Sequence, residues 1–443
     1  MRIQLSDHFH YSTLIRFVLP TIVMMVFTSI YTVVDGLFVS NFAGKTAFAA
    51  VNLIMPILMG MGAVGFLIGT GGSAVISRTL GEGNREKACQ YFSMMIYVTI
   101  GIGIMLSVVG LIFLRPISQA LGAEGQMLED CVTYGTIWLI FQTAFILQCA
   151  FQSFFVTAEK PKLGLYVTVA AGMSNVVLDA LFVAVFQWGL IGAVCATVIS
   201  QMVGGVFPLV YFARKNDSLL RLTRARIEWK ILLRVCTNGS SELMTNLSAS
   251  LVNILYNFQL MAIAGENGVA AYGVIMYVNF IFTAVYFGYA VGCAPIISYH
   301  FGADNHTELK NLFRKSLIIT AVLGLAMMIS SQILASPLAK IFVGYDAELF
   351  ELTCHGFRIY ALSFLLCGFN IFSSAFFTAL NNGAVSAGIA FLRTLVFQLA
   401  AILILPGLLG IDGVWLAIVA AEILALTVSV YFFVSRKKQY HYA

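Results

Sequence analysis

The chain has 443 residues, of which 60% are hydrophobic and 10% are charged, and its mean hydropathy is +0.91. Because soluble globular domains carry about 25% charged residues, this composition excludes an ordinary soluble enzyme and indicates a polytopic, all-α integral membrane protein. The net charge of +5 is concentrated in loops and is not the signature of a nucleic-acid-binding protein.

Twelve apolar runs follow one another, and each is long enough for a membrane-crossing helix, which needs about 20 residues. Because many runs follow the first one, we expect it to remain in the protein rather than be cleaved as a signal peptide. Prolines inside the runs, such as Pro20, Pro56 and Pro295, predict kinks, because proline removes an intrahelical hydrogen bond. The runs cover residues 14–40, 49–77, 90–114, 131–157, 163–186, 190–213, 233–262, 270–299, 313–335, 352–379, 384–406 and 411–434.

The first run ends in the stretch IYTVVDGLFVSNFAG (30–44), which places Asp35 in the membrane. An Asp at the centre of a bilayer costs about 3 kcal/mol on insertion scales. A chain keeps such a residue where it faces a polar interior, pairs with another group or binds a ligand. The alternative is that Asp35 lies close enough to the end of its helix to reach the lipid headgroups.

The loops on one side of the predicted membrane region carry most of the basic residues. With the N-terminus inside, only Lys45, Arg115 and Lys340 fall in the opposite loops. The positive-inside rule therefore predicts both termini in the cytoplasm, and an even number of spans agrees. We expect a multi-pass protein of a bacterial cytoplasmic membrane.

The longest loop is RKNDSLLRLTRARIEWKILLR (214–234), between the sixth and seventh runs. It is basic and partly amphipathic, so we expect it to lie on the anionic cytoplasmic leaflet. Its simplest role is that of a hinge that joins an N-terminal half, residues 1–213, to a C-terminal half, residues 235–443.

The two halves are a repeat. Without gaps, a shift of 221 positions aligns glycines and prolines along nearly the whole chain, as in Gly81 with Gly302 and Pro116 with Pro337. Six spans per repeat is an even number, so both copies share one topology. We therefore predict two six-helix repeats related by a pseudo-two-fold axis along the membrane normal, an arrangement typical of carriers that move two halves about a central site.

No motif of an enzyme is present in the sequence. The eight cysteines are scattered singly, without a CxxC pair or a Cys/His cluster, and there is no GxxxxGK[ST] phosphate-binding loop. No His/Glu cluster has metalloenzyme spacing, and no Ser/His/Asp set stands out. We therefore expect no cofactor, and energy that comes from an ion gradient or from the gradient of the substrate.

Polar residues inside three runs suggest a site. Tyr31 and Asp35 in the first run, and Asn175 and Asp179 in the fifth, are four residues apart, so each pair shares one helix face. Thr197 lies in the sixth run. If these side chains converge, two close carboxylates share and hold a proton, or the oxygens form a cage for a hard cation. The alternative is that Asp179 marks only the end of a span.

These stretches resemble the multidrug and toxic compound extrusion (MATE) transporters, bacterial type. The resemblance covers the whole chain and rests on IYTVVDGLFVSNFAG in the first run, SNVVLDALF in the fifth, GLIGAVCAT in the sixth and GVWLAIVAAE in the twelfth. It implies an N-terminal site for a cation such as Na⁺ at Asp35, Asn175, Asp179 and Thr197. Tyr31 matches a family position beside this site, and Tyr134 is a weaker match.

The C-terminal half departs from the family pattern. Some members carry acids deep in the seventh and tenth runs, whereas here Glu242 lies near the cytoplasmic start of the seventh and the tenth has none. Glu242 and the neighbouring Asn246 are the candidates of this half for contact with a cation or substrate. Arg393 and Glu422 are expected to form a structural ion pair, because an unpaired charge inside the membrane is costly.

The resemblance implies a secondary active antiporter that exports bulky, often cationic amphipathic compounds in exchange for Na⁺ or H⁺ by alternating access. The partners would be a small organic substrate and the lipid bilayer, with no nucleic acid, and a monomer would suffice. The nearest alternative is a lipid-linked oligosaccharide flippase of the same (MOP) superfamily. Its pyrophosphate cargo needs a basic cavity, whereas here Glu242 and Glu422 offset Arg358 and Arg393. A membrane-embedded lipid enzyme and a channel are more distant alternatives.

Overall fold

The computed structural model describes residues 3–42 and 45–442, which form helices and no strands. Ala43 and Gly44, the end of the first motif, lie outside the described residues. The N-terminal half contains α1 (Tyr11–Phe42), α2 (Lys45–Gly81), α3 (Arg85–Ala120), α4 (Gly125–Ile140), α5 (Gln142–Thr157), α6 (Pro161–Asp179), the π-helical turn η1 (Ala180–Val185) and α7 (Gly189–Ala213). The C-terminal half contains α8 (Trp229–Gly302), α9 (His306–Val343), α10 (Ala347–Tyr360), the 3-10 turn η2 (Ala361–Ser363), α11 (Phe364–Ala379), α12 (Gly383–Phe391), the π-helical turn η3 (Leu392–Phe397), α13 (Gln398–Leu409) and α14 (Ile411–Tyr440).

The expected twelve spans are present, but one of them is divided between two helices and two others are joined in one long helix. In the described part of the chain, ten helices are long and apolar enough to cross a membrane, and α4 with α5 forms an eleventh span bent by 58°. Helix α8 has 74 residues and is interrupted at Gly265, whose φ of 60° and ψ of −148° are not helical. Since α8 is far longer than one bilayer crossing, it supplies two spans, and the total is twelve.

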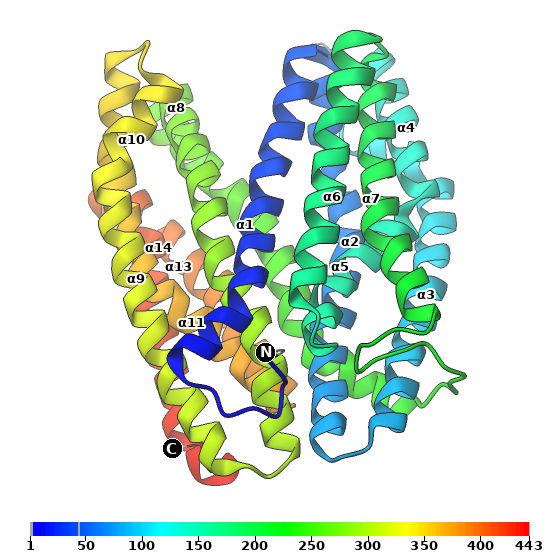
Figure 1. Cartoon of the computed structure of the whole chain (residues 1–443). Coiled ribbons are helices and arrows are strands. Elements are labelled where there is room, and N and C mark those ends of the chain that lie inside the picture. Colours follow the sequence, from blue (N-terminus) through cyan, green and yellow to red (C-terminus); the bar gives the residue numbers. More distant parts are fainter. Residues whose placement is uncertain (1–2, 43–44, 443) are drawn as a thin grey trace.

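The two halves lie side by side, with the N-terminal half in blue to green and the C-terminal half in green to red (Figure 1). Both chain termini lie at the same end of the molecule, which we call the terminal end. There the halves are held together, as Ser298 of α8 donates a hydrogen bond of 2.6 Å to the carbonyl of Ala74 in α2. The all-α fold in two repeats is therefore confirmed.

The pseudo-two-fold relation is visible in a pair of close backbone contacts. A methyl group on Gly81 of α2 would overlap the carbonyl oxygen of Tyr299 in α8, and one on Gly302 would overlap the carbonyl oxygen of Arg78. Each contact becomes the other after a shift of 221 positions. Two helices that cross at glycines can approach more closely than side chains would permit, so these residues set the closure at the terminal end.

The aromatic core of each half follows the same relation. The rings of Phe92 and Phe212 lie 5.0 Å apart, and those of Phe313 and Phe433, 221 positions later, also lie 5.0 Å apart. Phe92 and Phe212 belong to a buried cluster at the terminal end, and Phe313 and Phe433 are partly buried and pack against the same cluster. The repeat therefore extends from the sequence to the packing of the core.

The loop between the halves differs from expectation. Helix α8 already begins at Trp229, so the final part of the expected linker, residues 229–234, is helical. The remaining segment, 214–228, is docked on α3: Arg85 donates hydrogen bonds to the carbonyls of Ser218 and Leu219 at 2.9 and 3.0 Å. These contacts fix the linker on the N-terminal half.

The N-terminal segment, residues 3–10, contacts both halves. The backbone N–H of Leu5 donates to Glu159 at 2.7 Å, and that of Phe9 donates to Glu308 at 2.9 Å. Glu159 follows α5 in the N-terminal half, whereas Glu308 lies in the first turn of α9. His8 also bonds Glu308. The segment thus bridges the halves at the terminal end.

Candidate functional site

Three helices of the N-terminal half bring the predicted cation-site residues together. The hydroxyl of Thr197 in α7 lies 3.5 Å from the Asp35 carboxyl of α1 and 3.0 Å from the carbonyl oxygen of Ala193, and its one hydrogen is shared between these two acceptors. The Asp35 carboxyl also faces the side chains of Asn175 and Asp179 on α6. Residues more than 160 positions apart thus form one polar cluster, which we call the acid site.

The acid site lacks internal compensation. Asp179 is fully buried and Asn175 is nearly so. Within the described residues, the carboxylate oxygens of Asp179 and the amide nitrogen of Asn175 have no hydrogen-bond partner outside the acid site, and no Lys or Arg forms an ion pair with either acid. Because an unpaired buried charge is strongly unfavourable, two adjacent carboxyls here require a proton or a bound cation.

Local backbone features place the two acids at the same level. A methyl group on Gly172 of α6 would come within 2.7 Å of Tyr31, so the absence of a side chain there lets α1 approach α6 closely. Directly after Asp179 the α-helix widens into the π-helical turn η1. Such turns are uncommon and occur frequently at functional sites, because they reorient side chains within a helix.

Two tyrosines lie beside the acids, as the family resemblance implied. Tyr134 of α4 is buried, lies within electrostatic range of both Asp35 and Asp179, and stacks on Trp138. The hydroxyl of Tyr31 contacts Gln148 of α5. Sequence reasoning missed Gln148, which is one of three glutamines in the same span and has no feature in the sequence that distinguishes it from Gln142 and Gln152.

The donor set of the acid site suits a hard cation or a proton rather than a transition metal. No group of three or more His, Cys, Asp or Glu residues in the described chain could hold a metal ion. The acid site instead combines two carboxylates with an amide and a hydroxyl, which are oxygen ligands of the kind that hard cations prefer.

The C-terminal half contains a compensated charge network. Arg393 of η3 forms an ion pair with Glu422 of α14 at 2.8 Å and bonds both of its oxygens. Asn370 of α11 donates to Glu422 at 2.7 Å and accepts from Ser429 at 2.9 Å. Each polar group therefore has a partner, as a buried ion pair requires.

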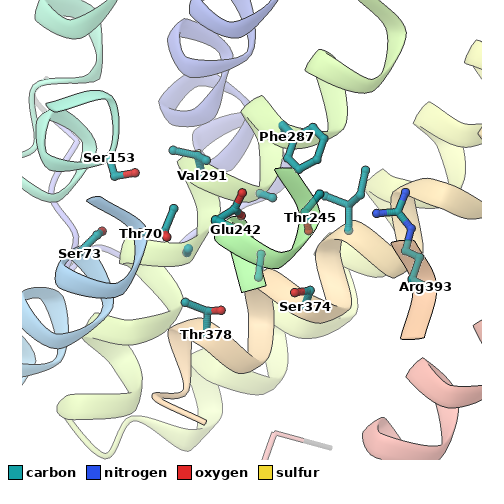
Figure 2. A pocket seen from close by; sticks show the side chains of 14 residues that line it. Thr70, Ser73, Ser153, Glu242, Thr245, Phe287, Val291, Ser374, Thr378 and Arg393 are labelled. Atoms are coloured by element: carbon teal, nitrogen blue, oxygen red, sulfur yellow. The ribbon is translucent and has the colours of Figure 1, made fainter. Parts of the chain in front are cut away.

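Glu242 and Asn246 of α8 have different surroundings. Glu242 lines a small cavity of about 40 Å³ between the halves, together with Arg393 (Figure 2). Asn246 is exposed and donates to the backbone of Glu242 at 2.8 Å, so it does not line that cavity. The other labelled side chains are Thr70, Ser73, Ser153, Thr245, Phe287, Val291, Ser374 and Thr378.

A second cavity of about 180 Å³ lies within the C-terminal half and shares Thr245, Phe287 and Arg393 with the first. Its walls include Tyr256 and Tyr272, whose rings stack 5.1 Å apart. These aromatic and polar walls were not predicted individually, because a cavity depends on how distant helices pack.

The family model MatE matches residues 20–181 and 243–403, one block in each half. The chain belongs to the MATE family of transporters. Both blocks include charged residues discussed above, Asp35 and Asp179 in the first and Arg393 in the second. As a MATE protein, the chain is a multi-pass membrane transporter rather than an enzyme.

Curated relatives cover nearly the whole MATE chain. The multidrug export protein MepA of Staphylococcus saprophyticus subsp. saprophyticus is 24% identical over 415 residues, with 93% of this chain and 91% of MepA covered. MepA of Staphylococcus haemolyticus is 23% identical over 413 residues, with 93% and 90% covered.

Solved structures share the fold. A MATE in complex with MaL6 has a TM-score of 0.93 and 22% identity, with 98% of each chain covered. An outward-facing multidrug resistance MATE transporter of the MOP superfamily has a TM-score of 0.92 and 23% identity, with 97% of this chain and 96% of that chain covered. A MOP superfamily transporter from Pyrococcus furiosus, whose reverse pocket polarity suggests a different function, has a TM-score of 0.88 and 22% identity, with 97% of both chains covered. These similarities establish the fold.

Proposed function

We propose that this MATE protein is an antiporter that exports bulky, often cationic amphipathic compounds in exchange for Na⁺ or H⁺. The observation that carries the proposal is the acid site, where Asp35 and Asp179 converge from separate helices without a basic partner in the described chain. The multidrug export function of the MepA relatives supports the choice of substrate class. The termini would be cytoplasmic, as the positive-inside rule predicts, and one chain would suffice as a monomer.

Coupling follows from the cost of the uncompensated acids. A cation or proton at the acid site offsets one of the two negative charges that Asp35 and Asp179 would carry, and it draws α1 towards α6. Without it, the two carboxylates repel each other and favour a different position of α1. Because a ligand shifts an equilibrium only by its difference in affinity for the two states, ion binding and substrate release become linked through α1.

The flippase alternative finds little support in the cavity around Glu242 and in the cavity within the C-terminal half. A lipid-linked pyrophosphate needs uncompensated basic residues, whereas Arg393 is bound to Glu422 and faces Glu242. Arg358 is exposed and does not line either cavity between the helices described above.

The test uses proteoliposomes that contain a fluorescent organic cation. A Na⁺ gradient and a H⁺ gradient are imposed separately on the parent protein and on Asp35→Asn. We expect one gradient to drive transport in the parent and neither to drive it in the variant. The control is Asp304→Asn, the same chemical change at an exposed turn, which should transport normally. Normal gradient-driven transport by Asp35→Asn would refute the mechanism.

A further inference from the structure

A cavity of about 450 Å³ opens at the terminal end between α1 and α6, away from the acid site. Its walls combine apolar and basic groups, and it is far larger than the cavity around Glu242. The lining residues are Ile3, Arg16, Phe17, Pro20, Glu159, Lys160, Pro161, Lys162 and Leu163. We call it the α1–α6 cavity.

The α1–α6 cavity carries uncompensated positive charge. Arg16 and Lys162 are exposed, and neither has an ion-pair partner among the residues that the structure describes. Lys160 is bound to Asp217 at 2.6 Å. Among the lining residues that the structure describes, Glu159 is the acidic one, and it accepts the N–H of Leu5. Two cations therefore remain to attract an anion.

The start of α6 strengthens this attraction. Helix α6 begins at Pro161, and the side chain of Lys160, at the N-cap position, makes no capping hydrogen bond. The free N–H groups and the dipole of a helix N-terminus favour a negatively charged ligand. Arg16, Lys162 and this uncapped helix end thus converge on one cavity.

The repeat shows that this cavity is particular to the N-terminal half. Arg16 and Lys162 correspond to Thr237 and Gly383 after the shift of 221 positions. In the C-terminal half the equivalent helices, α8 and α12, are in contact, because a methyl group on Gly383 would overlap the carbonyl oxygen of Thr237. The same fold can therefore close this gap. In the N-terminal half, where Arg16 and Lys162 line the gap, the gap is open.

We propose that the α1–α6 cavity binds the headgroup phosphate of an anionic phospholipid from the cytoplasmic leaflet. The phosphate would lie between Arg16, Lys162 and the start of α6. Phe17, Pro20 and Leu163 supply the apolar wall that a soluble anion does not need. The acyl chains would follow the outer face of α1, where Ile15 and Leu19 are 45% and 49% exposed.

Binding at this position is linked to the N-terminal segment. Ile3 of that segment forms part of the cavity wall, and Leu5 is bound to Glu159 beside it. The lipid therefore favours the arrangement in which this segment bridges both halves. The proposal uses the predicted orientation of the termini and does not depend on the coupling chemistry of the acid site.

The test measures lipid binding to the full chain by native mass spectrometry and by thermal stability in nanodiscs. Phosphatidylglycerol, phosphatidylcholine and inorganic phosphate are added separately. The test variant is Arg16→Gln with Lys162→Gln. A matched control removes the same charges from an exposed face of α9, with Lys310→Gln and Arg314→Gln. A charge-preserving variant exchanges the two cations, with Arg16→Lys and Lys162→Arg.

We expect the parent, the α9 control and the charge-preserving variant to retain a tightly bound phosphatidylglycerol. The test variant should bind it at least about tenfold more weakly, a difference of roughly 1.4 kcal/mol, while its stability in phosphatidylcholine stays unchanged. Equal loss in the α9 control, or equal binding of phosphatidylcholine, would overturn the proposal. Saturation by inorganic phosphate, with no preference for the lipid, would assign the cavity to a free anion instead and would also overturn it.

Discussion

The two halves of this protein treat buried charge in opposite ways. In the N-terminal half, Asp35 and Asp179 lie together without a basic partner in the described chain. In the C-terminal half, Glu422 is bound by Arg393 and Asn370. A compensated ion pair is satisfied in every conformation that keeps it intact, whereas an uncompensated acid pair changes its energy when an ion arrives or leaves. The difference supports the proposal that ion coupling takes place in the N-terminal half.

The charged residues of the two halves also occupy non-equivalent positions of the repeat. Arg393 stands where the N-terminal half has Gly172, and Glu422 stands where it has Gln201. Gly172 lets Tyr31 approach α6, so an arginine there would block the geometry of the acid site. Differences at these equivalent positions thus separate the acid site of one half from the ion pair of the other.

The largest expected effect comes from Asp179→Asn. We expect gradient-driven efflux to fall to the level of empty vesicles, because Asn cannot carry the charge that responds to the ion. Thermal stability should stay equal or rise, because a buried acid without a partner is removed. Proteoliposome transport and thermal unfolding of the same preparation measure both. A large loss of stability would show that Asp179 is a structural residue and would erase the contrast between the halves.

A second prediction concerns the compensated pair. Arg393→Met or Glu422→Leu alone should lower the free energy of unfolding by about 3–5 kcal/mol, because each leaves a buried charge unpaired. The double variant should recover most of that loss. Equilibrium unfolding in detergent micelles tests this as a double-mutant cycle. Failure of the double variant to recover would mean that one of the two residues has a role outside the pair.

A third prediction tests the closure at the terminal end. Gly302→Ala places a methyl group against the carbonyl oxygen of Arg78, and overpacking of this kind costs about 1–3 kcal/mol. The contact between α2 and α8 at the terminal end should therefore open more often. Labelling of Cys236 by a membrane-impermeant maleimide, read by peptide mass spectrometry, should rise. Gly273→Ala is the control, since a methyl group there meets no other atom within 4 Å. Equal labelling of both variants would contradict this role of Gly302.

The smallest effect is expected in the linker. The ammonium of Lys160 hydrogen-bonds Asp217 at 2.6 Å and lowers the pKa of that carboxyl. The pair therefore stabilises the docked linker above the ordinary pKa range of Asp, and the stabilisation is lost as the pH falls through the lowered pKa. Asp217→Asn should slightly increase hydrogen exchange in residues 214–228 at neutral pH and leave it unchanged in acid. No difference at neutral pH would show that the other contacts of the linker, such as those made by Arg85 and Ser93, hold it without Asp217.

Sequence patterns predicted the number of spans, the repeat and the candidates for the acid site. The four-residue spacing of Asn175 and Asp179 already places them on one helix face, and the cost of a lone buried charge pointed to the pairing of Arg393 with Glu422. The α1–α6 cavity and the bridge from Leu5 to Glu159 were not predictable in this way. They depend on contacts between residues more than 140 positions apart, for which local patterns carry no signal. The role of the acid site stays a prediction.

The N-terminal bridge has a consequence for the order of folding in the cell. The N–H of Phe9 is bound to Glu308, 299 residues further along the chain. During synthesis, Phe9 leaves the ribosome long before its acceptor exists, so its contact with the C-terminal half can form only after α9 has been inserted. At the usual 5–20 residues per second, this interval is roughly 15–60 s. A fusion partner placed just before residue 3 would lie next to residues 3–10 throughout that time and could block their contact with α9. Assembly of the terminal end should therefore be sensitive to N-terminal tags.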